Sequence, residues 1–425
     1  MAAPYRFVHT ADIHLDSPLK SLALRDPELA QLIGNATRKS FVRTIDLCID
    51  EAVDALLLAG DLYDGDQTSM KTALFFAEQL DRLHQHGIGA FIVRGNHDAE
   101  SRITRELVFR EGVKVFTSVA GVELPKRPEG SVPVAIHGLS FAKPHAPESL
   151  LKKYKAPLDR HVNIGIMHTS LSGAVGHDPY APCSPEDLHA SQFDYWALGH
   201  IHKRSVIKGK AHIVMPGNPQ GRDVNESGPK SVSLVTVGDD RAITVTERFT
   251  ALAQFETVRV DASTFSEWND LVHAITGALE SAREDVQADH LVARLRIEGN
   301  TPLAWRIRSD HDLLLTEAKF RASSIGNCWV EKIDVACSLA TTLRTNGNAD
   351  PVAELRNLIG AEILGSEAFK LQLAGIGDEL RSQLPADCRE VLGNNQAEYE
   401  ALLWELAREG SEDVLARISA ERSGK

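Results

Sequence analysis

The sequence predicts an α/β protein made of a large layered domain, a small α/β domain and a group of helices at the end. From Arg6 to about Val245, short runs rich in β-branched residues alternate with stretches of helical periodicity. The alternation of strand and helix restarts from about Glu256 to Cys337, and helical spacing of leucines dominates after Pro351. A chain of 425 residues is also too long for one ordinary domain. We therefore predict domains at residues 1–250, 251–340 and 341–425.

Candidate strands of the large domain are short apolar runs bounded by polar residues. They are Phe7–Thr10, Ala55–Ala59, Ala90–Val93, Val132–Ile136, Val162–Met167, Tyr195–Leu198, His212–Met215 and Val232–Val237. The amphipathic stretches Thr37–Val53 and Met70–His86 are predicted to be helices that cross over between the first strands. Polar and histidine clusters follow several of these runs directly. Because ligands in open α/β sheets lie beyond the carboxyl ends of strands, we expect the clusters to converge on one crevice.

The small domain is predicted from five alternating segments, and the chain ends in helices. The segments are Thr257–Val260, Ser266–Ser281, Leu291–Ile297, Asp310–Ala322 and Trp329–Val335, and the polar stretch Thr341–Asp350 is a predicted linker. Helices are predicted over Pro351–Leu384 and Gln396–Ile418. Their leucine stripes are Leu371, Leu373, Leu380 and Leu384, then Leu402, Leu403, Leu406 and Leu415. Packing on the chain's own domains and docking of a partner both account for these stripes.

Composition and charge limit the classes of function. No apolar run reaches the roughly 18 to 20 residues of a membrane helix, and the N-terminus lacks the pattern of a signal peptide. Five scattered cysteines, none in a Cys-x-x-Cys motif, fit neither a disulfide framework nor a thiolate metal site. We therefore predict a cytoplasmic protein without membrane contact. A formal net charge of -13 argues against coating of nucleic acid by bulk basicity, so DNA contact would need a local patch or metal ions.

Five segments place metal-ligand residues directly after apolar strands. The segments contribute Asp12 and His14, Asp61, Asn96 with His97, His168, and His200 with His202. Carboxylate, imidazole and amide oxygen suit Mn²⁺, Mg²⁺, Fe²⁺ or Zn²⁺, and two such ions about 3.5 to 4 Å apart can clamp a phosphodiester. One Asp-x-His or His-x-His alone is common by chance, but five ordered segments indicate a metal site. Gly60, Gly95 and Gly199 beside the ligands are expected to leave room for them.

The order Asp-x-His, Gly-Asp-x-x-Asp, Gly-Asn-His-Asp, isolated His and Gly-His-x-His resembles the signature of calcineurin-like metallophosphoesterases. The segments HTADIHLDSPL, GHDPYAPCSPEDL, DYWALGHIHKR and PGNPQGRDVNESGPKS resemble the SbcD-type DNA repair exonucleases, and most closely their YhaO-like branch. The resemblance covers roughly residues 5–250 and implies a metallophosphoesterase β-sandwich flanked by helices. The small domain would then be a capping domain that guides a DNA end.

The resemblance also implies a role for each ligand residue. Asp12, His14 and His202 would hold one metal ion, Asn96, His168 and His200 the other, and Asp61 would bridge the two. His97 would be the catalytic histidine with Asp98 as its partner, and the family's preferred ion is Mn²⁺. Some nucleases of this family carry a second catalytic histidine where this chain has Asp64, so we expect no metal contact from Asp64.

These expectations lead to a hypothesis of function and two rivals. We expect a Mn²⁺-dependent DNA exonuclease or endonuclease. It would be the nuclease subunit of an SbcCD-like complex, with an SbcC-like, SMC-type ATPase as its partner. A homodimer is a further possible assembly. A small-molecule phosphodiesterase or phosphoprotein phosphatase would use the same ions, and a non-catalytic ATPase-regulating subunit is the other rival. Arg222 and Lys203 are candidate phosphate contacts, although a solvated loop explains them as well. For His177, Asp178 and Tyr180, substrate contact and loop structure are equally open.

Overall fold

The chain divides into two compact units that are interleaved in the sequence. The computed structural model describes residues 3–17, 27–63, 69–100, 111–127, 130–141, 146–171, 180–339, 351–384 and 395–422. The first unit comprises Met1–Glu256, Ala282–Ala293 and Asn327–Glu331, and the second comprises Thr257–Ser281, Arg294–Gly326 and Lys332–Lys425. The boundaries expected at residues 250 and 340 stay a prediction, and the expected linker lies outside the described residues.

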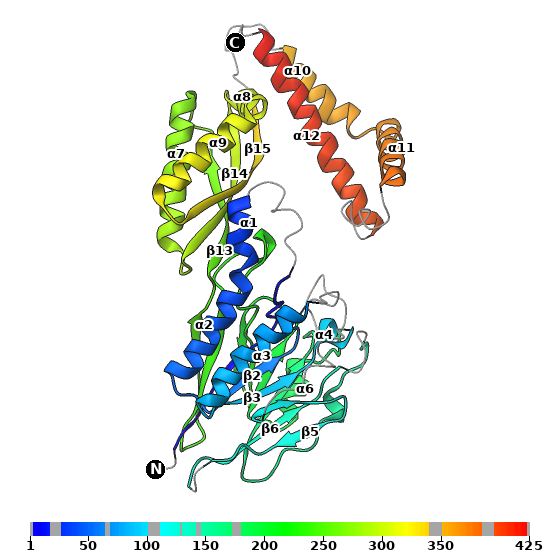
Figure 1. Ribbon diagram of the computed structural model, residues 1–425. Coiled ribbons are helices and arrows are strands. Elements are labelled where there is room, and N and C mark those ends of the chain that lie inside the picture. Colours follow the sequence, from blue (N-terminus) through cyan, green and yellow to red (C-terminus); the bar gives the residue numbers. More distant parts are fainter. Residues whose placement is uncertain are drawn as a thin grey trace. The chain divides into compact units, whose positions relative to one another are not determined.

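The first sheet of the first unit carries the amino-terminal half of the fold. Its strands are β1 (Tyr5–Thr10), β2 (Ala55–Ala59), β3 (Gly89–Val93), β4 (Val113–Val115), β11 (Ser231–Val237) and β12 (Ile243–Phe249), in the order β12-β11-β1-β2-β3-β4. Strands β1 to β4 are parallel, and β11 returns antiparallel beside β1. Helices α2 (Ala36–Asp50) and α3 (Met70–Gln85) lie beside β2 and β3 in Figure 1, while α1 (Pro27–Gly34) precedes α2 and packs with Ala253, Phe255 and Val292.

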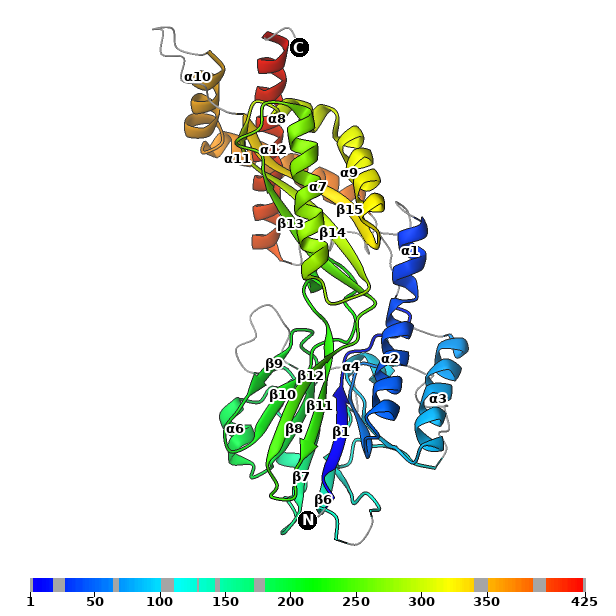
Figure 2. The same cartoon turned by 90° about the vertical axis from the view of Figure 1, so that its left-hand side faces the viewer.

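A second six-stranded sheet completes the layered core. Its order is β5-β6-β7-β8-β10-β9, with β5 at Gly121–Glu123, β6 at Val134–Gly138, β7 at Val162–His168, β8 at Tyr195–Gly199, β10 at His212–Met215 and β9 at Ser205–Ile207. Strands β6, β7, β8 and β10 are parallel neighbours, and both sheets are seen in Figure 2. The short elements η1 (Leu151–Lys153), α4 (Asn96–Glu100), α6 (Pro185–Ala190) and η2 (Val224–Glu226) lie in the connections.

Strand β2 packs against the second sheet on one face and against helices α2 and α3 on the other. Every residue of its sequence ALLLA is buried, because the strand is covered on both faces. Leu57 packs into the cluster between the two sheets with Phe7 and Ile164. Leu56 and Leu58 point the other way, into the cluster formed with the helix residues of α2 and α3. The predicted α/β class, sheets flanked by helices, is confirmed.

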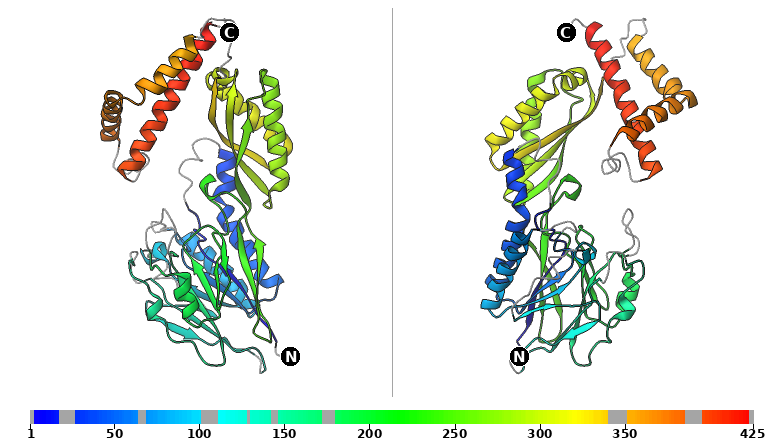
Figure 3. Two further views of the ribbon diagram at one scale, coloured as in Figure 1. Left: turned by 180° about the vertical axis from the view of Figure 1, so that it is seen from behind. Right: turned by 45° about the vertical axis from the view of Figure 1, so that its right-hand side comes forward.

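The second unit contains most of a small sheet together with helices, and the strand residues up to Glu256, Ala293 and Glu331 belong to the first unit. Strands β13 (Ala253–Asp261), β14 (His290–Thr301) and β15 (Cys328–Leu339) form a sheet in that order, with α7 (Trp268–Asp285), α8 (Ala304–Ser309) and α9 (His311–Ile325) in the connections. The carboxyl-terminal helices are α10 (Pro351–Leu358), the π-helix η3 (Ile359–Ile363), α11 (Glu367–Gln383) and α12 (Gln396–Arg422). Figure 3 shows α12, the long red helix, alongside α10.

The helix predicted over Pro351–Leu384 is divided in the structure. It loosens into the π-turn η3 and ends before Ser366, whose side chain accepts a hydrogen bond from Phe369 N and starts α11. No described helix combines the length and the apolar content needed to cross a bilayer. The cysteines within the described residues are Cys48, Cys183, Cys328 and Cys337; all four are buried, and none of these four forms a disulfide bond.

Replacement of Gly165 by alanine tests the packing of the second sheet. An added Cβ would lie 2.2 Å from the indole carbon Cζ3 of Trp196, a fully buried ring on the neighbouring strand β8. We expect Gly165→Ala to lower the free energy of unfolding by about 1 to 3 kcal/mol, because neither side has room to move. The measurement is thermal unfolding followed by circular dichroism.

Gly375→Ala in α11 is the matched control, since its added Cβ meets nothing within 4 Å. Alanine at that helical position is expected to raise stability by up to about 1 kcal/mol. An unchanged melting curve for Gly165→Ala would contradict the packing described here.

Candidate metal centre

The predicted ligand residues lie where strands of both sheets end. Asp12 and His14 follow β1, Asp61 follows β2, and Asn96 begins α4 after β3. His168 is the last residue of β7, while His200 and His202 follow β8. Since β1 to β3 are parallel neighbours, and so are β7 and β8, their carboxyl ends deliver these side chains to one edge of each sheet.

One group of ligand atoms is formed by Asp12, His14 and His202. The nearest ligand atoms of these three residues all lie within 4.8 Å of one another. The Nε2 atoms of His14 and His202 are 3.1 Å apart, so both imidazoles aim at the same small space. Asp12 also accepts the backbone N–H of His200 at 3.0 Å on each carboxylate oxygen, which ties the loop after β8 to the loop after β1.

The second group is formed by Asp61, His168 and His200. His168 Nε2 lies 3.3 Å from an Asp61 oxygen and 3.0 Å from the amide oxygen of Asn96. His168 Nδ1 donates to the carbonyl oxygen of Ala59 at 2.9 Å, and this bond aims Nε2 at the acidic side. The first group contains the three residues expected for one ion, and the second contains His168 and His200 of the other expected set together with Asp61. The assignment of these residues to two ions, and the bridging role of Asp61, stay predictions.

Burial and mutual charge set the protonation of the group. Burial and the charge of Asp61 raise the pKa of Asp12, while neighbouring imidazoles oppose them. For Asp61, burial raises the pKa, but His168, His14 and His97 outweigh it and hold the pKa below its ordinary value. Burial alone would lower the pKa of His168, yet Asp61 and Asp12 raise it to about 9. The pocket therefore favours positive charge beside its carboxylates, which a divalent cation also supplies.

Four of these ligand residues adopt left-handed backbone conformations. The φ angles are 52° at Asp12, 44° at His14, 52° at Asp61 and 109° at His200. Such angles are uncommon outside glycine and gather at functional sites, where surrounding structure holds the strain. Here they turn the chain sharply at the strand ends, so that the side chains face inward.

Glycines give the ligands the space that the sequence predicted. A Cβ on Gly95 would lie 2.2 Å from the Asp61 carboxylate, and one on Gly199 would lie 2.1 Å from the carbonyl oxygen of Ala59. Both contacts are too short for a real carbon atom, so glycine is required at these positions. The loops can therefore approach one another only without a side chain there.

His97 and Asp98 have different surroundings. The His97 ring is partly exposed and its centroid lies 5.3 Å from that of His14. Asp98 is buried, and its carboxylate accepts backbone N–H groups of Leu62, Tyr63 and Gly95 at 3.0, 3.2 and 3.1 Å. Burial and the nearby charge of Asp61 raise the pKa of Asp98 to about 7. Asp98 thus braces the loops of Asp61 and Asn96, and its partnership with His97 stays a prediction.

The loop after β10 contains a contact that was not foreseen from the sequence. Glu226 Oε1 accepts a hydrogen bond from His202 Nδ1 at 2.7 Å, and Arg222 Nη2 donates to the same oxygen at 2.7 Å. Burial raises the pKa of Glu226, but His202 and Arg222 outweigh it and hold the pKa well below its usual range. Arg222 is therefore linked to the ligand residue His202 through Glu226, while Lys203 is exposed. Contact of either residue with substrate stays a prediction.

Aromatic rings cover the second group of ligands. Tyr180 lies edge-on to His200 with ring centroids 5.0 Å apart, and Phe141 lies edge-on to His168 at 5.7 Å. These rings reduce the access of water to the imidazoles. Asp64, His177 and Asp178 lie outside the described residues.

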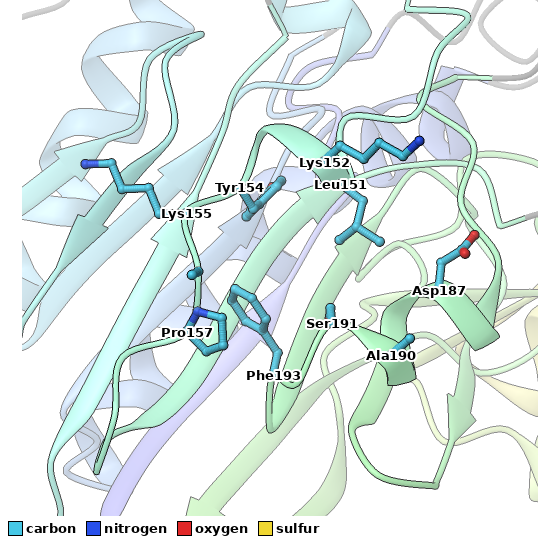
Figure 4. A pocket seen from close by; sticks show the side chains of 10 residues that line it. Leu151, Lys152, Tyr154, Lys155, Pro157, Asp187, Ala190, Ser191 and Phe193 are labelled. Atoms are coloured by element: carbon cyan, nitrogen blue, oxygen red, sulfur yellow. The ribbon is translucent and has the colours of Figure 1, made fainter.

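A separate pocket lies on the outer side of the second sheet (Figure 4). Its cavity of 320 Å³ is lined by residues that include Tyr154, Phe193, Lys152 and Asp187. Tyr154 donates to the carbonyl oxygen of Ile166, so its hydroxyl belongs to the packing of β7. None of the ligand residues lines this pocket, and the chemistry of the chain is therefore expected at the strand ends.

The donor set fits a pair of divalent cations. It offers carboxylate, imidazole and amide oxygen donors without thiolate, which suits Mn²⁺, Mg²⁺, Fe²⁺ or Zn²⁺. Asp12, His14, Asp61 and His168 are buried, whereas His200 and His202 are partly buried, and the six residues converge in two groups. A backbone carbonyl orients His168 and a carboxylate orients His202. The arrangement therefore meets the requirements of a dinuclear centre, and the identity of the metal is open.

Two known protein families match separate segments of this chain. Residues 5–204 match the family of calcineurin-like phosphoesterases, and residues 255–338 match the middle domain of metallophosphoesterase YhaO. The uncharacterized metallophosphoesterase YhaO of Bacillus subtilis is 38% identical over 239 residues, which cover 56% of this chain and 58% of that protein.

A DNA repair protein and a phosphatase of known structure show lower sequence identity to this chain. The DNA double-strand break repair protein Mre11 of Sulfurisphaera tokodaii is 25% identical over 218 residues, which cover 50% of this chain and 54% of that protein. A dimetal phosphatase from Danio rerio, a solved structure, is 12% identical with a TM-score of 0.36 and covers 58% of this chain and 97% of its own.

The two sequence relatives are each matched over less than two thirds of their length. The family models nevertheless account for the region that contains the ligand loops and for the strands and helices that follow it. The chain therefore carries a calcineurin-like metallophosphoesterase domain followed by a middle domain of the YhaO type.

Proposed function

We propose that this chain is a divalent-metal-dependent nuclease that hydrolyses phosphodiester bonds of DNA. The observation that carries the proposal is the convergence of two ligand groups, Asp12 with His14 and His202, and Asp61 with His168 and His200. The distant similarity to proteins named as DNA double-strand break repair factors supports DNA as the substrate. The donor set is compatible with Mn²⁺, which the family resemblance implies as the working ion.

Bound cations would neutralise charge on the phosphate and activate a water molecule for attack. Asp12, His14 and His202 would hold one ion, and Asn96, His168 and His200 the other, with Asp61 between them. The partly exposed ring of His97 lies beside His14, at the rim of the cluster. In this proposal His97 carries the proton that the departing oxygen takes up, and Asp98 keeps the loop beneath it in place.

The carboxyl-terminal helices support a partner of the SMC-type ATPase class. Exposure differs among the leucines of the two stripes. Leu403 and Leu415 are buried within the second unit, Leu373, Leu384 and Leu402 are partly buried, and Leu371, Leu380 and Leu406 are half or more exposed. Exposed leucines along a helix suit docking on another apolar helical surface. Because the chain is acidic, such a partner would also strengthen its weak attraction to DNA.

Replacement of His97 by asparagine separates chemistry from metal binding. We expect His97→Asn to cleave a linear duplex about 10² to 10⁴-fold more slowly in Mn²⁺, because a positioned proton donor is lost. Its Mn²⁺ content should equal that of the unaltered protein, since His97 belongs to neither ligand group. Single-turnover cleavage with and without Mn²⁺ measures the first effect, and metal analysis measures the second.

The nuclease assignment fails if the pure, Mn²⁺-loaded protein leaves every DNA end intact but hydrolyses a small phosphodiester well. That result would support a small-molecule phosphodiesterase with the same centre.

Asp61→Asn tests the central carboxylate. Loss of one negative charge between the imidazoles is expected to lower Mn²⁺ content and hydrolysis together, because Asp61 is the carboxylate of the second ligand group. Asp46→Asn is the control, since Asp46 pairs with Arg82 at the surface and its side chain is 46% exposed. Equal metal content in Asp61→Asn and Asp46→Asn would contradict the role proposed for Asp61.

The docking surface is tested with leucine-to-glutamate variants. We expect Leu371→Glu with Leu406→Glu to abolish co-elution with an SMC-type ATPase from the same genome, because the charges would have to be buried. Leu124→Glu, at a 55% exposed position in the first unit, should leave co-elution intact. Size-exclusion chromatography of the mixed proteins gives the result, and co-elution of the double variant would refute this surface.

A further inference from the structure

The imidazole of His202 is held at both of its nitrogens. Nε2 faces the first ligand group, 3.1 Å from His14 Nε2, and Nδ1 lies 2.7 Å from Glu226 Oε1. An ionised carboxylate only accepts hydrogen bonds, so Nδ1 carries a proton and the ring cannot rotate without losing this bond. The contact therefore fixes which nitrogen of His202 faces the cluster.

Glu226 itself has little freedom to move. Its Oε2 accepts the backbone N–H of Arg222 and the side-chain amide of Asn218, each at 2.8 Å, and its Oε1 accepts Arg222 Nη2. Asn218 is 1% exposed. Both oxygens are thus occupied by several donors, which orients the carboxylate before any ligand binds.

Bracing of the loop alone does not account for this arrangement. The loop has other supports, because Asn218 donates to the carbonyl oxygen of Gln220 and Asp223 accepts the N–H of Asn225. Glu226 reaches beyond the loop to a histidine 24 positions away. We infer that Glu226 is a positioning residue that aims His202 at the first cation, with Arg222 as its clamp, an inference that rests on the dinuclear centre of the proposed function.

Stepwise binding of Mn²⁺ to the purified full-length chain tests this inference without any assay of hydrolysis. We expect isothermal titration of the unaltered protein to resolve two ions. Glu226→Ala should bind one of them about 10 to 100-fold more weakly and the other with little change, because only His202 loses its support. Glu226→Gln keeps the size of the side chain but turns an amide N–H₂ toward donors, and it should lose affinity for the same ion to a smaller degree.

Glu247→Gln is the matched control. Glu247 lies on β12, pairs with Arg204, accepts a hydrogen bond from Ser231 and belongs to neither ligand group. This variant should bind both ions as the unaltered protein does. Thermal unfolding of all variants without metal separates loss of folding from loss of affinity.

Each outcome decides something definite. Unchanged binding in Glu226→Ala, or an equal loss at both ions, would overturn the inference, since the second result indicates a general loosening. If Glu226→Ala does not fold, Glu226→Gln is compared with the unaltered protein in the same way. Unchanged binding of both ions, or equal weakening of both, in Glu226→Gln would also overturn the inference. An unaltered chain that binds no Mn²⁺ refutes the dinuclear centre itself. A chain that binds two ions, depends on Glu226 and cleaves no DNA refutes only the nuclease proposal.

Discussion

The first unit depends on one electrostatic constraint: two carboxylates and several imidazoles are buried side by side at the ends of its strands. An isolated ionised group in such surroundings costs several kcal/mol, so each must be offset by a neighbour or by a cation. Asp61 and His168 offset each other, and Asp12 is bound by the backbone of the loop after β8. The two sheets must therefore keep a fixed alignment, which strand β2, buried on both faces, helps to provide.

Much of this fold and cluster was accessible from the sequence, because the information is local. Continuous apolar runs identify strands that are covered on both faces, and polar residues directly after them identify the carboxyl ends. Gly95 and Gly199 could be picked out because they stand next to the ligands in the sequence, but the atoms that exclude a side chain there, the Asp61 carboxylate and the Ala59 carbonyl oxygen, belong to a distant part of the sequence. Specific roles, such as a bridging position for Asp61, came from family resemblance and not from periodicity or spacing.

Other features depend on contacts that one sequence does not encode locally. Glu226 is a single acidic residue in a polar loop, and nothing nearby distinguishes it from a solvated side chain until the fold brings it to His202. The break between α10 and α11 was also missed, because leucine spacing continues through it and only the cap at Ser366 marks the new start. The two compact units exchange segments along the chain, an interleaving that the sequence does not reveal locally.

The left-handed backbone at Asp12, His14, Asp61 and His200 limits how this centre can change during evolution. Each position must meet two independent requirements. The left-handed backbone favours glycine, asparagine and aspartate, and the cation requires a side-chain donor of the right charge and length. Glycine adopts this backbone conformation easily but offers no donor, whereas glutamate offers a donor but disfavours the conformation. Drift to another ligand type would need simultaneous changes in loop conformation and donor chemistry, so this geometry resists gradual replacement.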